Sequence, residues 1–270
     1  MDKNIGFIGF GVMAQAMTGG IISSKLIEAK NLIVSDPLEN NLAIARNKFR
    51  INAVSDNIEV AKCSDILFLS VKPYKYSEVI DNIKAHVKDD VIIITIAAGI
   101  PIDFIQKAFN KAIKVVRTMP NTPALVGEGM SALCPSNMLT KEELQDVIKI
   151  FESFGKAEII EEKLMDAIPA ISGSSPAYVF MFIEALADGG VLSGIPRDKA
   201  YKLAAQAVLG AAKMVLETGE HPGVLKDRVC TPGGTTIEAV YTLEKNNFRG
   251  SIISAMESCT QKTINMSKGK

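Results

Sequence analysis

The sequence predicts an α/β domain with a doubly wound parallel sheet, followed by an all-α helical domain. Apolar runs of strand length alternate with helical patterns from the N-terminus to about residue 160. A glycine turn joins the first of these runs to the first helical pattern, and beyond about Leu164 the strand pattern stops. We therefore expect two domains, at residues 1–163 and 164–270.

The glycine turn Gly9-Phe10-Gly11, with Ala14, has the spacing G-x-G-x-x-A. Gly9 permits a tight turn, Gly11 lets a pyrophosphate approach the backbone, and Ala14 lets the helix pack close to the strand. The free N–H groups of the helix N-terminus favour the phosphates. An ordinary glycine turn is the alternative, but the position between a strand and a helix favours dinucleotide binding.

The rest of the first half continues the alternation that this turn begins. Continuous apolar runs are typical of parallel strands buried on both faces. We expect strands at Leu32–Val34, Ile66–Val71, Val91–Ile96, Lys114–Arg117 and Ala157–Ile160. Between them we expect helices at about Met13–Ser24, Leu42–Phe49, Tyr76–His86 and Ile102–Phe109, with capping-box patterns at Asp56 and Thr140. This pattern predicts a Rossmann dinucleotide-binding domain.

Asp36 follows the second predicted strand, where dinucleotide folds meet the adenosine ribose. An acidic side chain there binds the 2′-hydroxyl of NAD and repels the 2′-phosphate of NADP. The alternative is an Asp that only forms a turn before Pro37. Turn chemistry alone supports the two interpretations equally.

Two further strand ends carry candidate cofactor residues, because open α/β sheets bind ligands at the carboxyl ends of their strands. Lys72, before Pro73, is a candidate for contact with cofactor phosphate or ribose, and the alternative is a surface lysine. Ala97-Ala98-Gly99 ends another strand with small residues that leave room for a flat ring or a ribose.

The second half reads as helices at Pro176–Leu192, Arg197–Glu217, Thr235–Lys245 and Ser251–Met266. Their faces are rich in Ala and Gly, and a helix that is apolar on most sides must be buried on most sides. Four such helices do not bury themselves in a monomer. We therefore expect a homo-oligomer, at least a dimer, that assembles through these helices.

One loop of the second half has the composition of an anion site. Pro232-Gly233-Gly234 forms a tight turn that exposes backbone N–H groups suited to a small carboxylate. Thr235, with Glu238, has a capping-box pattern, and Thr236 offers a hydroxyl to a neighbouring ligand atom. The alternative, at about even odds on spacing alone, is a loop that only starts a helix.

Composition limits the partners and the location. Thirty basic residues balance thirty acidic ones, so nothing suggests nucleic acid as a partner. The four cysteines are scattered and there are two histidines, so we expect no metal site. A strand begins within a few residues of Met1, which leaves no room for a signal peptide. The longest uncharged stretch, Ala167–Ile183, contains Pro169, Pro176 and a Ser-Gly-Ser-Ser break, so we expect no membrane span and a cytoplasmic protein.

Together, these segments resemble the pyrroline-5-carboxylate reductase family over nearly the whole chain and in the right order. The motifs that carry the resemblance are Gly9-Phe10-Gly11, Val71-Lys72-Pro73, Ala97-Ala98-Gly99, Met119-Pro120-Asn121-Thr122-Pro123, Ser172-Gly173-Ser174-Ser175-Pro176-Ala177-Tyr178, Ala187-Asp188-Gly189-Gly190 and Pro232-Gly233-Gly234-Thr235-Thr236. The last of these is the family's signature region.

The resemblance implies reduction of 1-pyrroline-5-carboxylate to L-proline by hydride transfer from NADPH or NADH, the last step of proline biosynthesis. It places the cofactor contacts on Ile8, Gly9, Phe10, Gly11, Val12, Met13, Asp36, Asn57, Val71, Lys72, Pro73, Ala97 and Ala98. It places the substrate carboxylate against Gly233, Gly234, Thr235 and Thr236, and we choose Thr236 as the residue that hydrogen-bonds the imine nitrogen. Many family members carry Ser or Asn-Arg where this chain has Asp36, which leaves the choice between NADPH and NADH open.

Two other functions are compatible with a dinucleotide domain joined to helices. A β-hydroxyacid dehydrogenase needs a catalytic lysine in a glycine-rich Lys-x-x-x-Asn context, but Pro176–Leu192 contains no lysine and Lys199 and Lys202 lack that context. A non-catalytic NAD(P) sensor needs no carboxylate site, so the Gly233–Thr236 loop argues against it.

Overall fold

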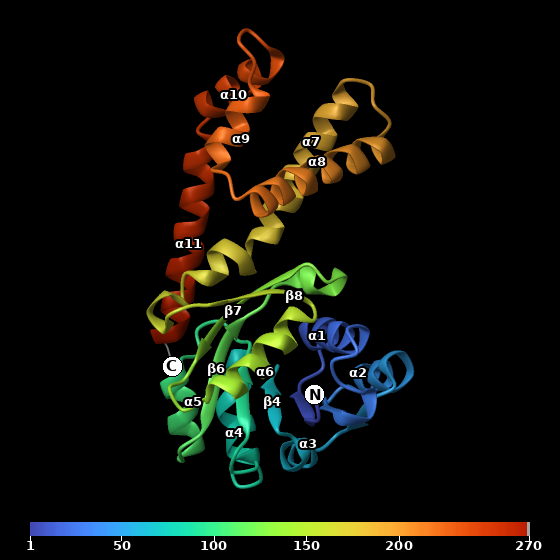
Figure 1. Ribbon diagram of the computed structural model, residues 1–270, viewed down its shortest axis with the longest axis vertical. Coiled ribbons are helices and arrows are strands. Elements are labelled where there is room, and N and C mark those ends of the chain that lie inside the picture. The colour runs from blue at the N-terminus through green and yellow to red at the C-terminus, as the bar shows by residue number, and fades with distance from the viewer. Residues whose placement is uncertain (269–270) are drawn as a thin grey trace. The chain divides into compact units, whose positions relative to one another are not determined.

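The computed structural model describes residues 1–268, which form two compact units (Figure 1). One unit contains residues 1–174 together with the chain from Cys259 onward, and the other is Ser175–Ser258. This division lies beyond the expected domain boundary after residue 163, because residues 164–174 and the end of the last helix pack with the sheet. The boundary between functional domains at 163 and 164 stays a prediction.

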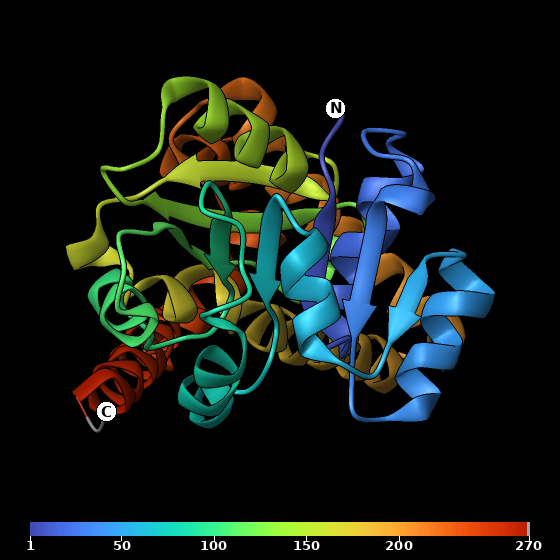
Figure 2. The ribbon, with the colours of Figure 1, turned by 90° about the horizontal axis from the view of Figure 1, so that it is seen from below.

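The first unit is built on one eight-stranded sheet of order β3-β2-β1-β4-β5-β6-β7-β8. Figure 2 shows its blue-to-teal strands side by side. All neighbouring strands are parallel except β6 and β7. The strands are β1 Ile5–Ile8, β2 Leu32–Ser35, β3 Asn52–Val54, β4 Ile66–Leu69, β5 Ile92–Thr95, β6 Lys114–Met119, β7 Gly129–Pro135 and β8 Gly155–Ile159. The predicted dinucleotide-binding fold is confirmed.

Six α-helices cover the two faces of this sheet. They are α1 Val12–Ser23, α2 Glu39–Ile44, α3 Asn57–Cys63, α4 Tyr76–Ile83, α5 Ile102–Phe109 and α6 Lys141–Glu152. The connections contain 3-10 turns at η1 Ala29–Asn31, η3 Pro73–Lys75, η4 Thr122–Val126 and η5 Glu162–Leu164, and π-helical turns at η2 Ala45–Phe49 and η6 Pro169–Gly173.

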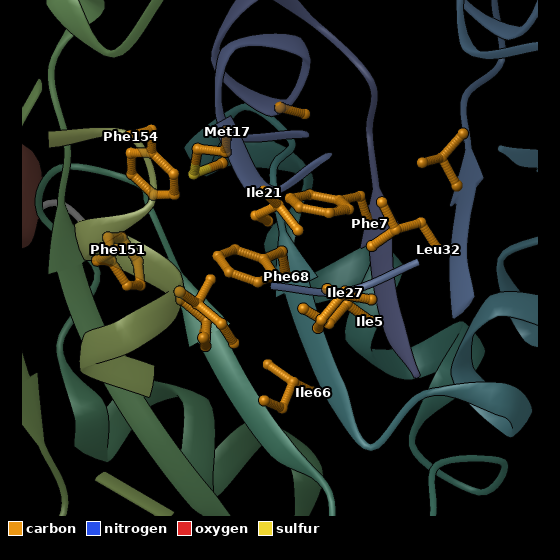
Figure 3. Packing of buried hydrophobic residues seen from close by; sticks show 14 of the residues in the cluster. Ile5, Phe7, Met17, Ile21, Ile27, Leu32, Ile66, Phe68, Phe151 and Phe154 are labelled. Atoms are coloured by element: carbon orange, nitrogen blue, oxygen red, sulfur yellow. The ribbon is translucent and has the colours of Figure 1, made fainter. Parts of the chain in front are cut away.

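Alternation along each strand divides the buried side chains between the two faces. On β4, Phe68 joins a cluster with residues of α1, α2 and α6, whereas Leu67 and Leu69 join a cluster with residues of α3, α4 and α5. The rings of Phe7 and Phe68 stack at 4.5 Å between centroids in the first cluster (Figure 3). Continuous apolar runs are therefore required here, because neither face of the strand meets water.

The sequence pattern predicted neither the three-residue strand β3 nor the seven-residue strand β7. Strand β7 pairs antiparallel with β6 and parallel with β8, so it extends the parallel sheet beyond the dinucleotide-binding half. Its residues Gly129–Pro135 mix small and polar residues with apolar ones, so they lack both the continuous run and the strict alternation that would mark a strand.

The second unit contains α7 Ser175–Leu192, α8 Arg197–Thr218, α9 Pro222–Val229, α10 Thr235–Lys245 and the first half of α11 Phe248–Lys268. Helices α7 and α8 approach closely, since a Cβ on Gly190 would lie 3.3 Å from the Cβ of Ala200. Helix α9 is one that the sequence pattern did not predict. Pro222 occupies its first turn, where a missing N–H costs nothing.

Most of the apolar surface of the second unit is exposed in the single chain. Among its described residues, the buried hydrophobic ones are Ala187, Ala200 and Ala204, whereas Phe180 is 63% and Leu216 83% exposed. One helical stretch, Pro169–Leu192, is long and apolar enough to cross a membrane by length and composition. Its most apolar 18 residues have a mean hydropathy of 1.2, and 11% of them are buried. It is interrupted at Ser174, within the predicted Ser-Gly-Ser-Ser break, but its two prolines lie in first turns and do not break helices.

Candidate dinucleotide site and substrate loop

The glycine loop that follows β1 can be built only with glycine at its first position. Gly9 has φ +90°, and a Cβ there would lie 2.8 Å from the carbonyl oxygen of Ser70. Its N–H donates to the carbonyl oxygen of Ser35 at 2.8 Å. The loop is therefore fastened between the ends of β2 and β4, as the glycine spacing requires.

Gly11 meets a different requirement, because it leaves space open. It is the N-cap of α1 with φ −73°, and a Cβ there would meet nothing within 4 Å. No side chain caps the helix, and its first turn contains no acidic residue. The first-turn N–H groups are thus free of side-chain acceptors and face the open side of the loop, which suits an anion.

A buried polar atom adds to this fit. The hydroxyl oxygen of Ser70 is buried without a hydrogen-bond partner among the described residues. Ser70 follows β4, and its N–H donates to the carbonyl oxygen of Ile8 at 2.8 Å. An orphaned hydroxyl next to the glycine loop, together with the open space at Gly11, fits the pyrophosphate half of a dinucleotide.

Asp36 combines the two roles that the sequence left open. Its Oδ2 accepts a 2.7 Å hydrogen bond from the N–H of Phe10, and its Oδ1 accepts one of 2.9 Å from the N–H of Leu38. The second bond forms the expected turn around Pro37, whereas the first ties the glycine loop to β2. Asp36 is only 7% exposed, and its carboxylate places a negative charge beside the glycine loop.

Asn57 begins α3 after the N-cap Asp56, whose side chain accepts a 2.8 Å hydrogen bond from the N–H of Ile58. The hydroxyl of the buried Ser35 donates to Oδ1 of Asn57 at 2.7 Å. This bond holds the carbonyl side of the amide inward, so the amide nitrogen is the group left to donate to a ligand. The sequence reasoning did not identify Ser35 as a residue that orients Asn57.

The remaining predicted cofactor residues follow β4 and β5. Lys72 is exposed and is the N-cap of η3, with Pro73 as its first residue. Ala97 is buried and Ala98 half-buried, and next to them Gly99 has φ +70°. A Cβ on Gly99 would lie 3.1 Å from Oγ of Ser267 on α11, so this loop needs a small residue.

The structure brings these segments to one edge of the sheet. The predicted cofactor residues follow the carboxyl ends of β1, β2, β4 and β5 or begin the helix after β3, and the strand order reverses between β1 and β4. Open α/β sheets bind their ligands at such a reversal. We call this set the cofactor edge: Ile8, Gly9, Phe10, Gly11, Val12, Met13, Asp36, Asn57, Val71, Lys72, Pro73, Ala97 and Ala98.

The predicted substrate residues lie in the second unit, at the start of α10. Gly233 has φ +67°, and a Cβ on Gly234 would lie 2.3 Å from Oγ1 of Thr231. Gly234, not Thr235, is the N-cap, so the capping box predicted for Thr235 and Glu238 is wrong. The Gly-Gly turn supplies the extended N-cap residue itself and makes Thr235 the first residue of the helix.

Helices α1 and α10 therefore begin in the same way. Each has a glycine N-cap with extended backbone and no side-chain cap. Asp56, Thr140 and His221 cap α3, α6 and α9 with their side chains. Helices α2, α4, α5 and α8 also lack a side-chain cap, but their N-caps are not glycine. First-turn N–H groups without a side-chain cap are available to an anion.

No cluster of three or more His, Cys, Asp or Glu residues able to hold a metal lies within residues 1–268. His221 uses Nδ1 to accept a 3.0 Å hydrogen bond from the N–H of Gly223. The His221 imidazole therefore serves as the N-cap of α9.

The fold and these two helix starts define a class, the dinucleotide-dependent oxidoreductases whose second domain is helical. Two family models match the chain. The model described as NADP oxidoreductase coenzyme F420-dependent matches residues 4–99, and the model described as pyrroline-5-carboxylate reductase dimerisation matches residues 162–266.

Individual relatives narrow the class. The chain is 49% identical to the pyrroline-5-carboxylate reductase of Escherichia coli strain K12, over 99% of this chain and 100% of the relative, and 39% identical to that of Arabidopsis thaliana, over 98% and 95%. The crystal structure of Plasmodium falciparum pyrroline carboxylate reductase with NADP bound has a TM-score of 0.90 at 34% identity, over 98% of each chain. The chain belongs to the pyrroline-5-carboxylate reductase family.

Proposed function

We propose that the cofactor edge and the Gly233–Thr236 loop carry out the reaction of this family, the reduction of 1-pyrroline-5-carboxylate to L-proline. As a family member the protein is an NAD(P)H-dependent oxidoreductase of the last step of proline biosynthesis. The observation that carries the residue assignment is the start of α10, where a Pro-Gly-Gly turn leaves the first-turn N–H groups without a side-chain cap.

The cofactor edge would hold NADPH or NADH, which supplies a hydride when bound. The α1 N-terminus and Gly11 receive the pyrophosphate, and Asp36 and Asn57 face the adenosine ribose. Lys72, with Val71 and Pro73, contacts a cofactor phosphate or ribose, and the small residues Ala97 and Ala98 leave room for a flat ring or a ribose. The open position at Gly11 and the orphaned hydroxyl of Ser70 support this assignment.

The substrate carboxylate binds the N–H groups at the start of α10, where the helix dipole favours a negative charge. Thr236, half-buried in the first turn, places its hydroxyl next to that anion site. Reduction adds a hydride to the ring carbon of the C=N bond and a proton to its nitrogen. The proton comes from solvent water, and Thr236 hydrogen-bonds the nitrogen and passes the proton to it.

Alignment is the main task of these residues. A protonated C=N bond already accepts a hydride readily, so holding the reacting carbon in place accounts for most of the rate enhancement. This agrees with the chemistry of the residues assigned to the site: backbone N–H groups, small side chains and one hydroxyl, without a pair of general acid and base groups.

The assembly follows from the same family. The dimerisation model covers residues 162–266, which include the exposed apolar faces of α7 and α8, and family membership supports an oligomer. At least two copies of the chain cover these faces with each other, Phe180 and Leu216 included. We assign the protein to the cytoplasm, with a small-molecule substrate and without a nucleic-acid or membrane partner.

One assay tests the function. Oxidation of NADH and NADPH is followed with 1-pyrroline-5-carboxylate. Reduction of NAD⁺ and NADP⁺ is followed separately with 2- and 3-hydroxyacids. We expect turnover with the pyrroline and none with the hydroxyacids. Cofactor binding without turnover would favour a sensor, and turnover with a hydroxyacid would favour a dehydrogenase.

The role of Thr236 is tested by Thr236→Ala. We expect turnover to fall about 100-fold, because the group that relays the proton is removed, while the dissociation constant for NAD(P)H stays near wild type. The matched control is Thr242→Ala, which removes a hydroxyl further along α10 that bonds the carbonyl oxygen of Glu238. Unchanged turnover in Thr236→Ala would remove Thr236 from the mechanism.

A further inference from the structure

Tyr76 is a fully buried tyrosine whose hydroxyl lies between the ends of two strands of the cofactor edge. It is the first residue of α4 and is 0% exposed. Its hydroxyl lies 2.7 Å from the carbonyl oxygen of Leu69, the last residue of β4. The same hydroxyl lies 2.8 Å from Oγ1 of Thr95, the last residue of β5. Leu69 and Thr95 are also paired in the sheet register.

The direction of these hydrogen bonds follows from the groups at the two ends. The carbonyl oxygen of Leu69 can only accept, so Tyr76 donates its single proton there. Thr95 must then donate to the oxygen of Tyr76. At the other end, the N–H of Ala97 donates to Oγ1 of Thr95 over a long 3.5 Å contact. The result is one chain with a fixed direction: Ala97 N–H to Thr95, Thr95 to Tyr76, and Tyr76 to Leu69.

The chain of bonds joins two loops that are far apart in the sequence. Leu69 leads through Ser70 into Val71-Lys72-Pro73, and Ala97 is itself a cofactor-edge residue. Burial raises the pKa of the Tyr76 hydroxyl well above its usual value, and the hydrogen bond with Thr95 only partly opposes that shift. The hydroxyl is therefore protonated, and able to donate, throughout the neutral range.

Packing alone does not require the hydroxyl. Tyr76, Val79, Ile80 and Ile83 recur at helical spacing on the buried face of α4, where phenylalanine would fill the same space. The oxygen of a buried tyrosine must find partners, and here both partners are at the ends of cofactor-edge strands. We propose that Tyr76, with Thr95, is a positioning residue that sets the spacing of the Val71–Pro73 and Ala97–Ala98 loops for NAD(P)H. This inference rests on the proposed cofactor site.

The test uses Tyr76→Phe and Thr95→Val in the full-length protein, with Thr95→Ser as the conservative variant. The control is Ser64→Ala, which removes a buried hydroxyl that donates to the carbonyl oxygen of Val60 at 2.6 Å. Ser64 precedes β4, at the opposite edge of the sheet from the cofactor loops. Loss of stability from a deleted buried hydroxyl is thus separated from loss of positioning.

Two readouts do not depend on turnover: the dissociation constants for NADH and NADPH by calorimetry, and amide hydrogen exchange of the cofactor-free protein. We expect Tyr76→Phe and Thr95→Val to weaken cofactor binding about fivefold and to speed exchange at Ala97 and in the Val71–Pro73 loop. Thr95→Ser should keep the wild-type cofactor affinity and the wild-type exchange rates. Ser64→Ala should lower the melting temperature without changing the affinity or the exchange rates.

The inference is overturned if Tyr76→Phe and Thr95→Val bind the cofactors as the wild type does, or if Ser64→Ala weakens binding equally. These outcomes are distinct from a failure of the proposed function. A wild-type protein that binds NAD(P)H but does not reduce the pyrroline would overturn the function, and the binding and exchange data would still decide the role of Tyr76.

Discussion

Asp36 holds the glycine loop with one carboxylate oxygen and its own turn with the other. The sequence could identify the residue, because an acidic side chain after the second strand is a known ribose ligand in dinucleotide folds. It could not identify the bond to Phe10, because that contact depends on how close the first two strands lie. The fixed charge beside the loop now gives a physical reason to expect NADH to bind more tightly than NADPH.

Asp36→Asn tests this charge. We expect the affinity for NADPH to rise about tenfold relative to NADH, because repulsion of the 2′-phosphate is removed. The single carbonyl oxygen of Asn can keep one of the two backbone hydrogen bonds, so a modest loss of stability is also expected. The measurement is the dissociation constant of each cofactor. The control is Asp103→Asn, an exposed residue on α5 whose carboxylate pairs with Lys107 at 2.6 Å. Tighter binding of NADPH than of NADH by the wild type would contradict the argument.

At the scale of elements, sequence patterns succeeded where each strand or helix carries its own signal. The capping box at the start of α6 is confirmed: Thr140 accepts from the N–H of Glu143, and Glu143 accepts from the N–H of Thr140. The same pattern at Thr235 and Glu238 was wrong, because the preceding Gly-Gly turn made Gly234 the N-cap. A capping-box pattern shows that two side chains could bond the first backbone N–H groups of a helix. The backbone conformation before the helix decides which residue is the N-cap.

Glu143→Gln tests the α6 start. Burial would raise the pKa of Glu143, but hydrogen bonds from Lys114 at 2.6 Å and from Thr140 outweigh it and hold the pKa below its usual value. Such a carboxylate stabilises the fold above its unfolded pKa, and this contribution is lost as pH falls through the lower folded pKa. We expect Glu143→Gln to lower the free energy of unfolding by about 1 kcal/mol at pH 7.

The difference between Glu143→Gln and wild type should shrink at acidic pH, where the wild-type carboxylate is itself protonated. Urea unfolding at pH 7 and at the lowest pH at which the protein stays folded measures it. Glu142→Gln, at the exposed neighbouring position, is the control and should change little at either pH. An equal difference at both pH values would show that the charge of Glu143 does not contribute.

At the scale of the molecule, the two units bury themselves to different extents. The sheet unit encloses two complete clusters of apolar side chains, whereas α7 and α8 leave large apolar residues exposed. Exposed apolar faces of this extent mark interaction surfaces. The dimerisation family model spans the same residues, so a second copy of the chain is the partner that fits.

Phe180→Glu tests the assembly. Phe180 is 63% exposed on α7, so the single chain tolerates a charge there, but burial of that charge against a second copy would be costly. We expect the wild type to elute as an oligomer in size-exclusion chromatography with light scattering at micromolar concentration, and Phe180→Glu to shift it toward monomer. Lys202→Glu, at an exposed polar position on α8, should keep the wild-type mass. A wild-type monomer at that concentration would contradict the expectation.

The sequence by itself determined the dinucleotide fold, the helical second half and the family, because these depend on local signals: the Gly9-Phe10-Gly11 turn, continuous apolar strands and motifs in a fixed order. Tertiary structure decided what depends on contacts between distant residues. It decided that β7 extends the sheet, that Ser35 orients Asn57, that Asp36 fastens the glycine loop, and that Tyr76 links two strand ends. The apolar spacing of α4 marks Tyr76 as buried, but the partner of a buried hydroxyl is set by the neighbouring strands, which no local pattern encodes.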